Sequence, residues 1–385
     1  MAGEHYDSEI EKNAVDYGYK TANLMYLSDA VKEFEASKEA AKLHELYGDV
    51  RGEVPAFKGV DAKIIETHLD THTPEWRGLF ENFQNRFNEQ EDKSVLGEPA
   101  KESLKRLQGV ITDCFEKHQI SQDLFNEFLT KNDLGINALV MVRSTGVHED
   151  KADMANPGGN ESLPCHANIP EITRALGVVA ASYVGEKSLS QRLGAGDTTI
   201  AEFPVMPGLV QRMVDGNVCS GVVYTNNGST RMQAAPGHGE YVVNSKGRVD
   251  NYYVSPEDIV YSEIRPKDFR LKPKVDLANN KVSLERVDNP FELKYESALP
   301  EPVVLYLNEL GKFIEKKYGK RMDMEFVYNP ETNTINIVQA RSIPEGQRKG
   351  LVPSAVSPDF LGVNKAKLNI VDGLQLLRLT LTEQQ

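Results

Sequence analysis

The stretch Met322–Ser342, MDMEFVYNPETNTINIVQARS, is the part of the sequence that decides the fold. Apolar and polar residues alternate on both sides of a polar segment, Asn329–Asn333, which contains a proline. Alternation with a period of two is typical of a strand with one buried face, and turn-forming residues between two such runs favour a hairpin. The stretch therefore predicts antiparallel strands at 322–328 and 334–340.

Four polar side chains of this hairpin would gather on shared faces. Alternate residues of a strand share a face, which groups Asp323 with Glu325, and Gln339 with Arg341. Carboxylate and amide oxygens suit Mg²⁺, and an arginine beside them would offer a fixed fork of donors to phosphate. A solvated hairpin face with an incidental ion pair is the alternative, and the hairpin alone leaves both interpretations open.

Outward from the hairpin, the chain divides into a helical first part and a part that is rich in strands from about residue 201. The residues between Met154 and Pro164 are rich in glycine, proline and asparagine, which predicts a loop. Helices are expected at about 28–48 (capped by Ser28-Asp29 and ended by Gly48), 99–118, 121–129, 170–193 and 301–318. Strands are expected at 138–142, 205–214, 219–225, 239–244 and 249–254, the last two joined by a turn at 245–247.

Several of these segments carry residues suited to binding a nucleotide. Arg143 follows a buried strand, and strand ends commonly present phosphate-binding side chains. The glycine loop 156–162 could approach a phosphate closely and act as a lid. Lys20 follows Gly18 before a helix, although without the ending of a Walker A sequence, and 210–214 could line a slot for a base. The alternatives are a surface turn, a solvated lysine and a plain core strand.

The charge balance argues against one class of function. Among the 385 residues, 44 are Lys or Arg and 57 are Asp or Glu, which gives a formal net charge of −13. Proteins that bind nucleic acids through phosphate contacts are usually basic, so nucleic-acid binding is disfavoured. A local basic pocket for a small anion is compatible with this charge.

The cysteines and the lengths of the apolar runs indicate the cellular compartment of the protein. Cys114, Cys165 and Cys219 lie far apart, which fits neither a disulfide framework nor a zinc site. The polar start of the sequence lacks the apolar region of a signal peptide, and no apolar run reaches about 18 residues. We therefore expect a cytoplasmic protein without a membrane contact.

Six motifs occur in the order found in the N-terminal ATP-binding domain of phosphoenolpyruvate synthase and pyruvate phosphate dikinase, an ATP-grasp fold. For example, GYKTANL resembles that family's GGKGANL, and VRSTGVHED resembles its VRSSATAED. The resemblance covers about residues 15–343. The six segments are 18–24, 142–150, 157–169, 210–227, 237–243 and 322–342.

The resemblance implies roles for individual residues. Those expected to hold the ATP phosphates are Lys20 and Arg143, with Gly158 and Gly159 closing over them and Glu161 and Ser162 beside. Those expected at the adenine and ribose are Gln211, Met213, Val214 and Glu240. Those expected to ligate Mg²⁺ are Glu325 and Gln339, while Arg341 would steady the transferring group with support from Asp323.

The resemblance also implies an architecture, with some departures from the family's motifs. We expect an α+β, ATP-grasp fold of two lobes with the nucleotide between them, helix-rich in its N-terminal part and strand-rich in its C-terminal part. The expected divisions are 1–198 for the first lobe, 199–344 for the second, and 345–385 for a linker and docking tail. The departures are Tyr19 for the second glycine of GGK, Ser162 for threonine, and His238 within GxGE.

The family's phosphorylatable histidine has no counterpart with the right flanking residues. Cys165-His166-Ala167 lacks the Gly-Gly and Thr of the signature GGxT[SC]HAA, and the eight histidines form no metal-binding pattern. We therefore expect the histidine on a partner subunit, in a hetero-oligomer. Such a chain resembles the ATP-binding subunit of the phenylphosphate synthases. This implies cleavage of ATP to AMP and transfer of the β,γ-diphosphoryl group to the partner's histidine. Release of phosphate to water would then leave phosphohistidine, which phosphorylates phenol.

Three alternatives remain open at this point. The chain could serve another phosphoenolpyruvate-synthase-like phosphotransferase with a different acceptor. It could be a non-catalytic subunit that senses nucleotides, although a sensor could lose transfer residues that are present here. It could also be an ATP-grasp ligase, which would release ADP rather than AMP.

Overall fold

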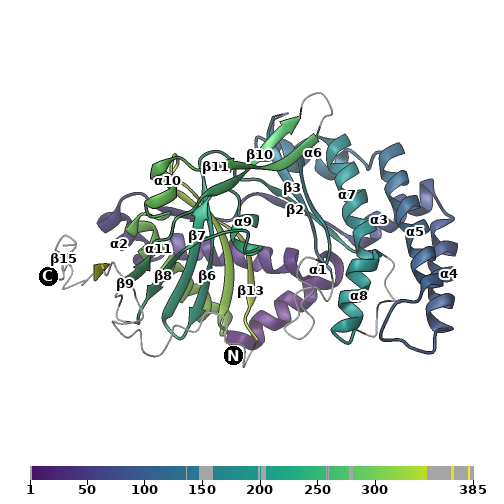
Figure 1. Cartoon of the computed structure of the whole chain (residues 1–385), viewed down its shortest axis with the longest axis horizontal. Coiled ribbons are helices and arrows are strands. Elements are labelled where there is room, and N and C mark those ends of the chain that lie inside the picture. Colours follow the sequence, from purple (N-terminus) through teal and green to yellow (C-terminus); the bar gives the residue numbers. More distant parts are fainter. Residues whose placement is uncertain are drawn as a thin grey trace.

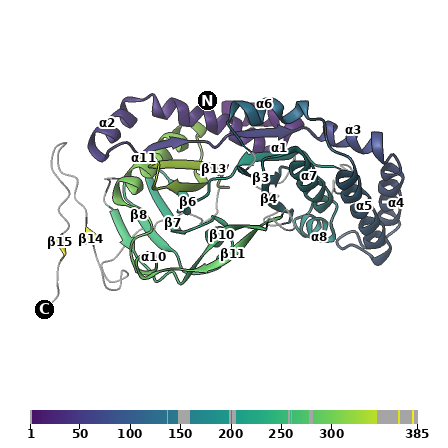
Figure 2. The ribbon, with the colours of Figure 1, turned by 90° about the horizontal axis from the view of Figure 1, so that it is seen from above.

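The computed structural model describes residues 2–135, 137–146, 159–197, 200, 205–256, 258, 260–276 and 281–344, together with the backbone of 366–367 and 380–381. Two parts lie side by side, one built on a seven-stranded sheet and one on a four-stranded sheet with many helices (Figure 1). Helix α1, Ala2–Glu35, runs along both parts (Figure 2). This helix therefore links the two sheets that flank the candidate site.

The seven-stranded sheet contains the hairpin that the sequence predicts. Its strands, in spatial order, are β1 (Arg51–Glu53), β13 (Thr334–Ser342), β12 (Met322–Asn329), β6 (Cys219–Asn226), β7 (Ser229–Pro236), β8 (Asp250–Val254) and β9 (Val260–Glu263). One face packs against α1 and α11, Glu301–Tyr318, through a large apolar core that includes Met324 and Leu310. Burial of one face fixes the register, so the polar residues of the hairpin must lie on the opposite face.

The four-stranded sheet has the order β2 (Phe57–Val60), β5 (Gly208–Arg212), β3 (Leu139–Ser144) and β4 (Ser162–His166). One face packs on α7, Ile169–Tyr183, through Val140, Val142 and Val210. The other helices of this part are α3 (Ala62–His72), α4 (Trp76–Asn88), α5 (Glu98–Lys117), α6 (Asp123–Lys131) and α8 (Glu186–Gly194). Strand β5 follows the expected lobe boundary at 198/199, yet it pairs with β2 and β3 in this sheet.

A separate two-stranded hairpin reaches from one part to the other. Its strands are β10, Phe269–Asp276, and β11, Lys281–Asp288, and β11 contacts β4 of the four-stranded sheet. Figure 2 shows this hairpin extending from the seven-stranded sheet toward β4. The remaining elements are α2 (Lys38–Tyr47), α9 (Glu240–Val243), α10 (Phe291–Tyr295), β14 (Ala366–Lys367) and β15 (Thr380–Leu381).

The expected α+β class is confirmed, with a helix-rich N-terminal part and a strand-rich C-terminal part. The predicted strands at 322–328 and 334–340 and the helices at 99–118 and 301–318 are also confirmed within a few residues. In the described residues, no helix is both long enough and apolar enough to cross a membrane.

Three local predictions were wrong. Residues 240–243 form a helical turn rather than a strand, and the turn is closed by the backbone N–H of Asn244, which donates to the oxygen of Glu240 at 3.1 Å. Ser28 is not a cap, since α1 continues through it. The region 170–193 is divided into α7 and α8, and Gly185 is the N-cap of α8.

Candidate functional site

The polar residues of the β12–β13 hairpin stand on the open face of the seven-stranded sheet. Asp323 lies directly opposite Arg341, and Glu325 lies directly opposite Gln339. Arg341 donates from Nε and Nη2 to Oδ2 of Asp323, at 3.1 and 3.0 Å. Asp323 is 5% exposed, so this pair is a largely desolvated, oriented arginine–carboxylate contact. The hairpin face is therefore an organised cluster rather than a solvated surface.

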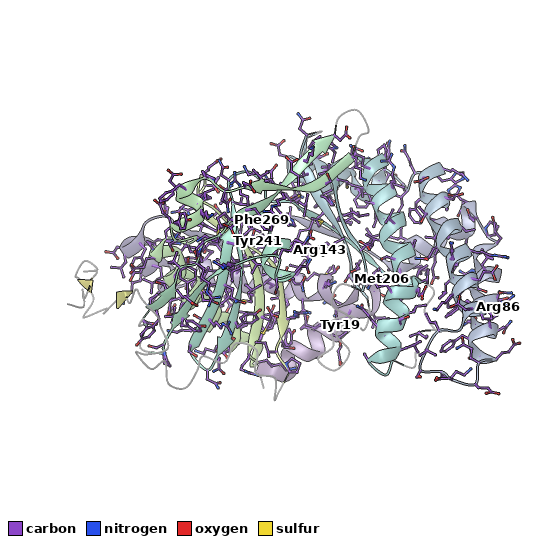
Figure 3. All side chains as sticks on the ribbon, in the orientation of Figure 1. Tyr19, Arg86, Arg143, Met206, Tyr241 and Phe269 are labelled. Atoms are coloured by element: carbon purple, nitrogen blue, oxygen red, sulfur yellow. The ribbon has the colours of Figure 1, made fainter. Side chains whose placement is uncertain are left out.

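Arg143 connects this cluster to the four-stranded sheet. From the end of β3 its Nη1 donates to Oε1 of Gln211 at 3.1 Å and to the backbone oxygen of Val338 at 3.2 Å. Its Nη2 donates to Oε1 of Gln339 and lies 3.8 Å from Oε2 of Glu325. Figure 3 places Arg143 near the middle of the molecule, between the two sheets. One guanidinium thus contacts β5, β12 and β13 together.

A break in α1 brings Lys20 to the end of β3. Gly18 has φ = 75°, and a Cβ there would lie 1.6 Å from the backbone oxygen of Thr145, so glycine is required at this approach. The backbone N–H of Thr21 donates to Oγ1 of Thr145 at 3.2 Å. Nζ of Lys20 donates to Oγ of Ser144 at 3.3 Å. The lysine therefore adjoins the residue that follows Arg143.

The inner face of the four-stranded sheet changes from apolar to polar along its strands. Arg143 and Met141 alternate with buried residues along β3, and Met141 lies opposite Gln211 on β5. At the far end, Leu139 and Met213 are both buried in a small apolar cluster that includes Met141. A ligand along this face would meet an apolar surface at one end and the guanidinium of Arg143 at the other.

The residues expected from the glycine loop are only partly described. Gly158 lies outside the described residues, and Gly159 is buried. Glu161 is exposed, and its backbone N–H donates to Oγ of Ser182 on α7 at 3.0 Å. Ser162 lies opposite Arg143 in the β3–β4 ladder. The end of this loop is thus tied to the four-stranded part next to Arg143.

Glu240 is paired with a lysine of its own segment, and Val214 lies two residues beyond the end of β5. Oε1 of Glu240 pairs with Nζ of Lys246 at 2.6 Å, while its backbone N–H donates to Nδ1 of His238 at 3.3 Å. Burial lowers the pKa of His238 to about 4, opposed by Glu240 and assisted by Arg143 and Lys246. The imidazole beside the cluster is therefore neutral at pH 7.

Sequence reasoning missed a tyrosine in the same cluster. Tyr224 on β6 lies directly opposite Asp323. Burial raises the pKa of Tyr224 to about 12, with Asp323 and Glu325 adding to the rise and Arg341 opposing it. The phenol is therefore a proton donor at neutral pH. In the sequence, Tyr224 follows Val222 by two residues, so both are expected on one face of the same strand. Nothing in that pattern distinguishes the tyrosine from an ordinary strand residue.

The donor set on the hairpin fits a hard divalent cation such as Mg²⁺. Glu325, Gln339 and Asp323 offer carboxylate and amide oxygens, which are the ligands this ion prefers. The described residues contain no cluster of three His, Cys, Asp or Glu side chains placed to hold a metal. A cation here would therefore take further ligands from a substrate, and Arg143 would have to release the oxygen of Gln339.

The sequence is similar to those of known ATP-binding domains. The family model "Pyruvate phosphate dikinase, AMP/ATP-binding domain" matches residues 40–367. A probable phosphoenolpyruvate synthase of Methanocaldococcus jannaschii is 30% identical over 211 residues, which cover 53% of this chain and 17% of that protein. Phosphoenolpyruvate synthase of Escherichia coli is 29% identical over 220 residues, which cover 53% of this chain and 27% of that protein.

The chain thus spans a small fraction of the length of these curated relatives. Among solved structures, D-alanyl-alanine synthetase A from Vibrio cholerae covers 69% of this chain and aligns over 61% of its own, with 11% identity and a TM-score of 0.27. A similarity at that level supports no structural or functional inference.

Proposed function

The chain belongs to the family of pyruvate phosphate dikinase AMP/ATP-binding domains and has its ATP-grasp-like fold, and from that premise we propose that it cleaves ATP to AMP and passes the diphosphoryl group to a histidine. One observation carries the proposal. The face between the sheets runs from the apolar residues Leu139 and Met213 to Arg143, and Lys20 contacts Ser144 at the same end of β3. A nucleoside triphosphate has the same order, an apolar base at one end and a polyanion at the other.

The chain's own residues bind and orient the triphosphate in this proposal. Lys20 and Arg143 neutralise phosphate oxygens, and Arg143 exchanges its contact with Gln339 for one with phosphate. Arg341 is held in one orientation by Asp323, so its guanidinium can meet charge that develops on the transferring group without reorganising. Mg²⁺ held by Glu325 and Gln339 would neutralise phosphate charge when bound.

The transfer is a substitution at the β-phosphorus. The bond between that phosphorus and the oxygen on the α-phosphate breaks, a bond to a histidine nitrogen forms, and AMP leaves. We propose that the acceptor histidine lies on a partner subunit. Two local histidines are poor candidates, because Nδ1 of the partly buried His238 accepts the backbone N–H of Glu240, while His166 is buried with Nδ1 held by Glu171 at 3.0 Å.

Phenol as the final phosphoryl acceptor is a finer part of the proposal. Water first releases the γ-phosphate from the diphosphorylated histidine, and the β-phosphoryl group left on the histidine then passes to phenol. The support for this acceptor is the resemblance of the chain's architecture and size to the ATP-binding subunit of the phenylphosphate synthases. The described residues include no aromatic site that we assign to phenol, so this acceptor would bind on the partner. Formation of phenylphosphate only when phenol, MgATP and both proteins are present would support it. Transfer to pyruvate or another acceptor instead would favour a different synthase-like system.

The experiment that tests the proposed reaction follows two labels at once. The chain is incubated with MgATP labelled at either the α- or the β-phosphate, with and without the proteins encoded beside it. We expect α-label in AMP and β-label on a histidine of the partner. Glu325→Gln and Arg341→Gln should both abolish the transfer, whereas His238→Asn should not.

Other products would point elsewhere. Labelled ADP with no AMP would favour a ligase-type reaction through an acyl phosphate. Binding of ATP without any turnover in the presence of every candidate partner would favour a nucleotide-sensing subunit. Label on His238 of the chain itself would contradict the partner-histidine proposal.

A further inference from the structure

The open face of the seven-stranded sheet carries a row of polar and aromatic side chains that extends beyond the β12–β13 hairpin. Alternate residues of a strand share a face, and Val223, Met232 and Tyr252 belong to the core on the helix side. Their neighbours in the sequence therefore stand on the face of the candidate site. The residues that lie directly opposite one another on successive strands are Arg341, Asp323, Tyr224, Arg231, Tyr253 and Tyr261.

Arg231 on β7 is a cation without an acceptor in this row. Among the described residues, its guanidinium forms neither a hydrogen bond nor an ion pair, and its Nε is buried. Its Cζ lies 5.6 Å from the centroid of the Tyr253 ring, so a cation–π contact holds the group over the sheet. A buried donor without an acceptor costs free energy, and an anion that reaches this guanidinium would satisfy it.

Tyr224 on β6 stands between Arg231 and the pair formed by Asp323 and Arg341. Burial raises the pKa of Tyr224, and both arginines oppose that rise, so both positive charges act on the phenol. One end of this face is covered by α9, which contacts β6 and β7 (Figure 1). Tyr224 packs against the apolar cluster beneath α9 and is partly buried. The row thus begins at the margin of the covered part of the sheet.

We propose that Arg231 and Tyr224, together with Arg341, form a site for a terminal phosphate group, either the γ-phosphate of bound ATP or the inorganic phosphate that it becomes. The inference rests on the proposed function and extends it from the hairpin to β6 and β7. The roles that the motif resemblance implies fall on neither Arg231 nor Tyr224. In this site the guanidinium groups and the phenol donate to phosphate oxygens.

Charge and spacing favour an anion over a purely structural row. Asp323 is already engaged by Arg341, so a second arginine leaves this part of the row with an excess of positive charge. Neighbouring strands lie about 4.8 Å apart, which separates the backbones of Arg341 and Arg231 by about 14 Å across β12 and β6. Long side chains from these positions can converge on a phosphate above Tyr224.

The row also lies within reach of the proposed triphosphate site. Arg143 contacts Gln339 and Glu325, which face each other across the hairpin. Arg341 and Asp323 form the next pair on the same face, two residues along each strand. Two residues of a strand span about 7 Å. A polyphosphate held at Arg143 therefore has its terminal group near the start of the row.

The molecule supplies matched controls for both side chains. Arg286 on β11 also lies over an aromatic ring, with its Cζ 3.9 Å from the centroid of Phe269, but its side chain is 62% exposed. Arg286→Met therefore removes the same charge as Arg231→Met without changing the row. Tyr253→Phe removes a phenol on the other side of Arg231 and keeps the ring beneath its guanidinium.

The experiment measures ligand binding to the full chain by calorimetry. The nucleotides are MgADP and a MgATP analogue with a methylene group between the α- and β-phosphorus, which cannot be cleaved there. Inorganic phosphate is titrated separately into the chain saturated with MgADP, which leaves the terminal position empty. The difference between the ATP analogue and ADP reports on the γ-phosphate, and the third titration reports on free phosphate.

For Arg231→Met we expect at least about a tenfold loss of affinity for the ATP analogue or for inorganic phosphate, with ADP affinity unchanged. A loss for the analogue assigns the site to the γ-phosphate, and a loss confined to inorganic phosphate assigns it to the released phosphate. Tyr224→Phe should cost about threefold. Arg231→Lys should recover part of the affinity, because the charge remains while the planar fork is lost. Arg286→Met and Tyr253→Phe should change no affinity.

Three results would overturn the inference. Equal effects of Arg231→Met and Arg286→Met would indicate long-range charge alone. A loss of ADP affinity as large as that of the other ligands would indicate a structural role for Arg231. A loss in Tyr253→Phe but not in Tyr224→Phe would put the anion on the wrong side of Arg231.

Failure of the proposed function has a different signature. If the wild-type chain binds no nucleotide, inorganic phosphate is titrated into the free chain. Binding of phosphate that is lost in Arg231→Met and kept in Arg286→Met would then support the phosphate site while refuting the proposed function. Binding of nucleotide with none of the expected effects in Arg231→Met would refute the site and leave the proposed function standing.

Discussion

The cluster around Arg143 and the cluster around Lys267 both surround a cation with oxygen atoms, but they differ in how completely the charges are paired. Nζ of Lys267 donates to both carboxylate oxygens of Asp250 at 2.9 Å and to the backbone oxygens of Arg265 and Glu296. Lys267 and Asp250 are both fully buried. Asp250 also accepts from the backbone N–H groups of Arg265 and Ala298.

The Arg143 cluster is less closed. The side chains of Arg143 and Glu325 are 15% and 21% exposed, and 3.8 Å separates their nearest charged atoms. This contact can reorganise when a polyanion or a cation arrives, whereas the Lys267 contact cannot without leaving a buried charge alone. This difference indicates that the Lys267 cluster stabilises the fold, whereas the Arg143 cluster is suited to binding a ligand.

The largest expected effect comes from breaking the closed cluster. Asp250→Ala leaves Lys267 buried without its partner and should lower the free energy of unfolding by about 3–5 kcal/mol, or prevent folding altogether. Urea denaturation measures this. Asp250→Asn, which keeps an oxygen acceptor, should cost less. Full stability of Asp250→Ala would mean that the two clusters do not differ as described.

The next largest effect should be a dependence of the free energy of unfolding on pH, which comes from His238 beside the Arg143 cluster. Burial holds the pKa of His238 near 4, below its ordinary value of 6.5, so the unfolded chain binds more protons than the folded chain between these values. The free energy of unfolding should therefore fall as the pH drops from 6.5 toward 4. His68 on α3, whose pKa burial also lowers to about 4, adds to the slope.

His238→Asn should flatten part of that slope and His68→Asn another part. Denaturation curves at several pH values measure both contributions. An unchanged slope in His238→Asn would contradict the burial of a neutral imidazole beside Arg143.

Removal of the cation from the open cluster should cost less stability than Asp250→Ala. Arg143→Met loses hydrogen bonds to Gln211, Gln339 and Val338 and leaves the buried amide oxygens of Gln211 and Gln339 without this donor, but it leaves no fully buried charge, so we expect a loss of about 1–3 kcal/mol. The same urea experiment measures it. A loss as large as that of Asp250→Ala would show that Arg143 holds the two parts together.

The smallest effect should come from an exposed ion pair. Lys274 and Glu285 meet at 3.0 Å across the β10–β11 hairpin, with side chains 58% and 42% exposed. Such pairs contribute little because water and salt screen them. Lys274→Ala should leave the denaturation midpoint unchanged at physiological salt. A clear shift would show that the hairpin is more sensitive than its exposure indicates.

Local patterns predicted the central hairpin and the long helix at 301–318, because both are set by periodicity and turn residues within one segment. Strand β7, STRMQAAP, was missed because its small and polar residues lack a strand pattern, and its burial comes from neighbouring strands. The strands β10 and β11 were missed for a similar reason, since lysines and a proline interrupt them.

The candidate site divides in the same way. Alternation along a strand predicts that Asp323 shares a face with Glu325, and Gln339 with Arg341. The register of β12 and β13 confirms this prediction. The contact between Arg143 and Gln339 joins residues 196 positions apart, so no local pattern predicts it. The motif resemblance indicated both residues, but the roles it implies for them stay predictions until they are tested.

The most direct test of the account is the affinity of the full chain for MgATP, measured by calorimetry for the wild type, Arg143→Met and Arg86→Met. Arg86 is an exposed arginine on α4 at the far end of the helical part (Figure 3) and serves as the matched control. We predict that Arg143→Met lowers the affinity at least about 100-fold, the effect of losing a desolvated charge contact to phosphate, while Arg86→Met changes nothing. Equal affinities in all three proteins would contradict the assignment of the Arg143 cluster as the triphosphate site.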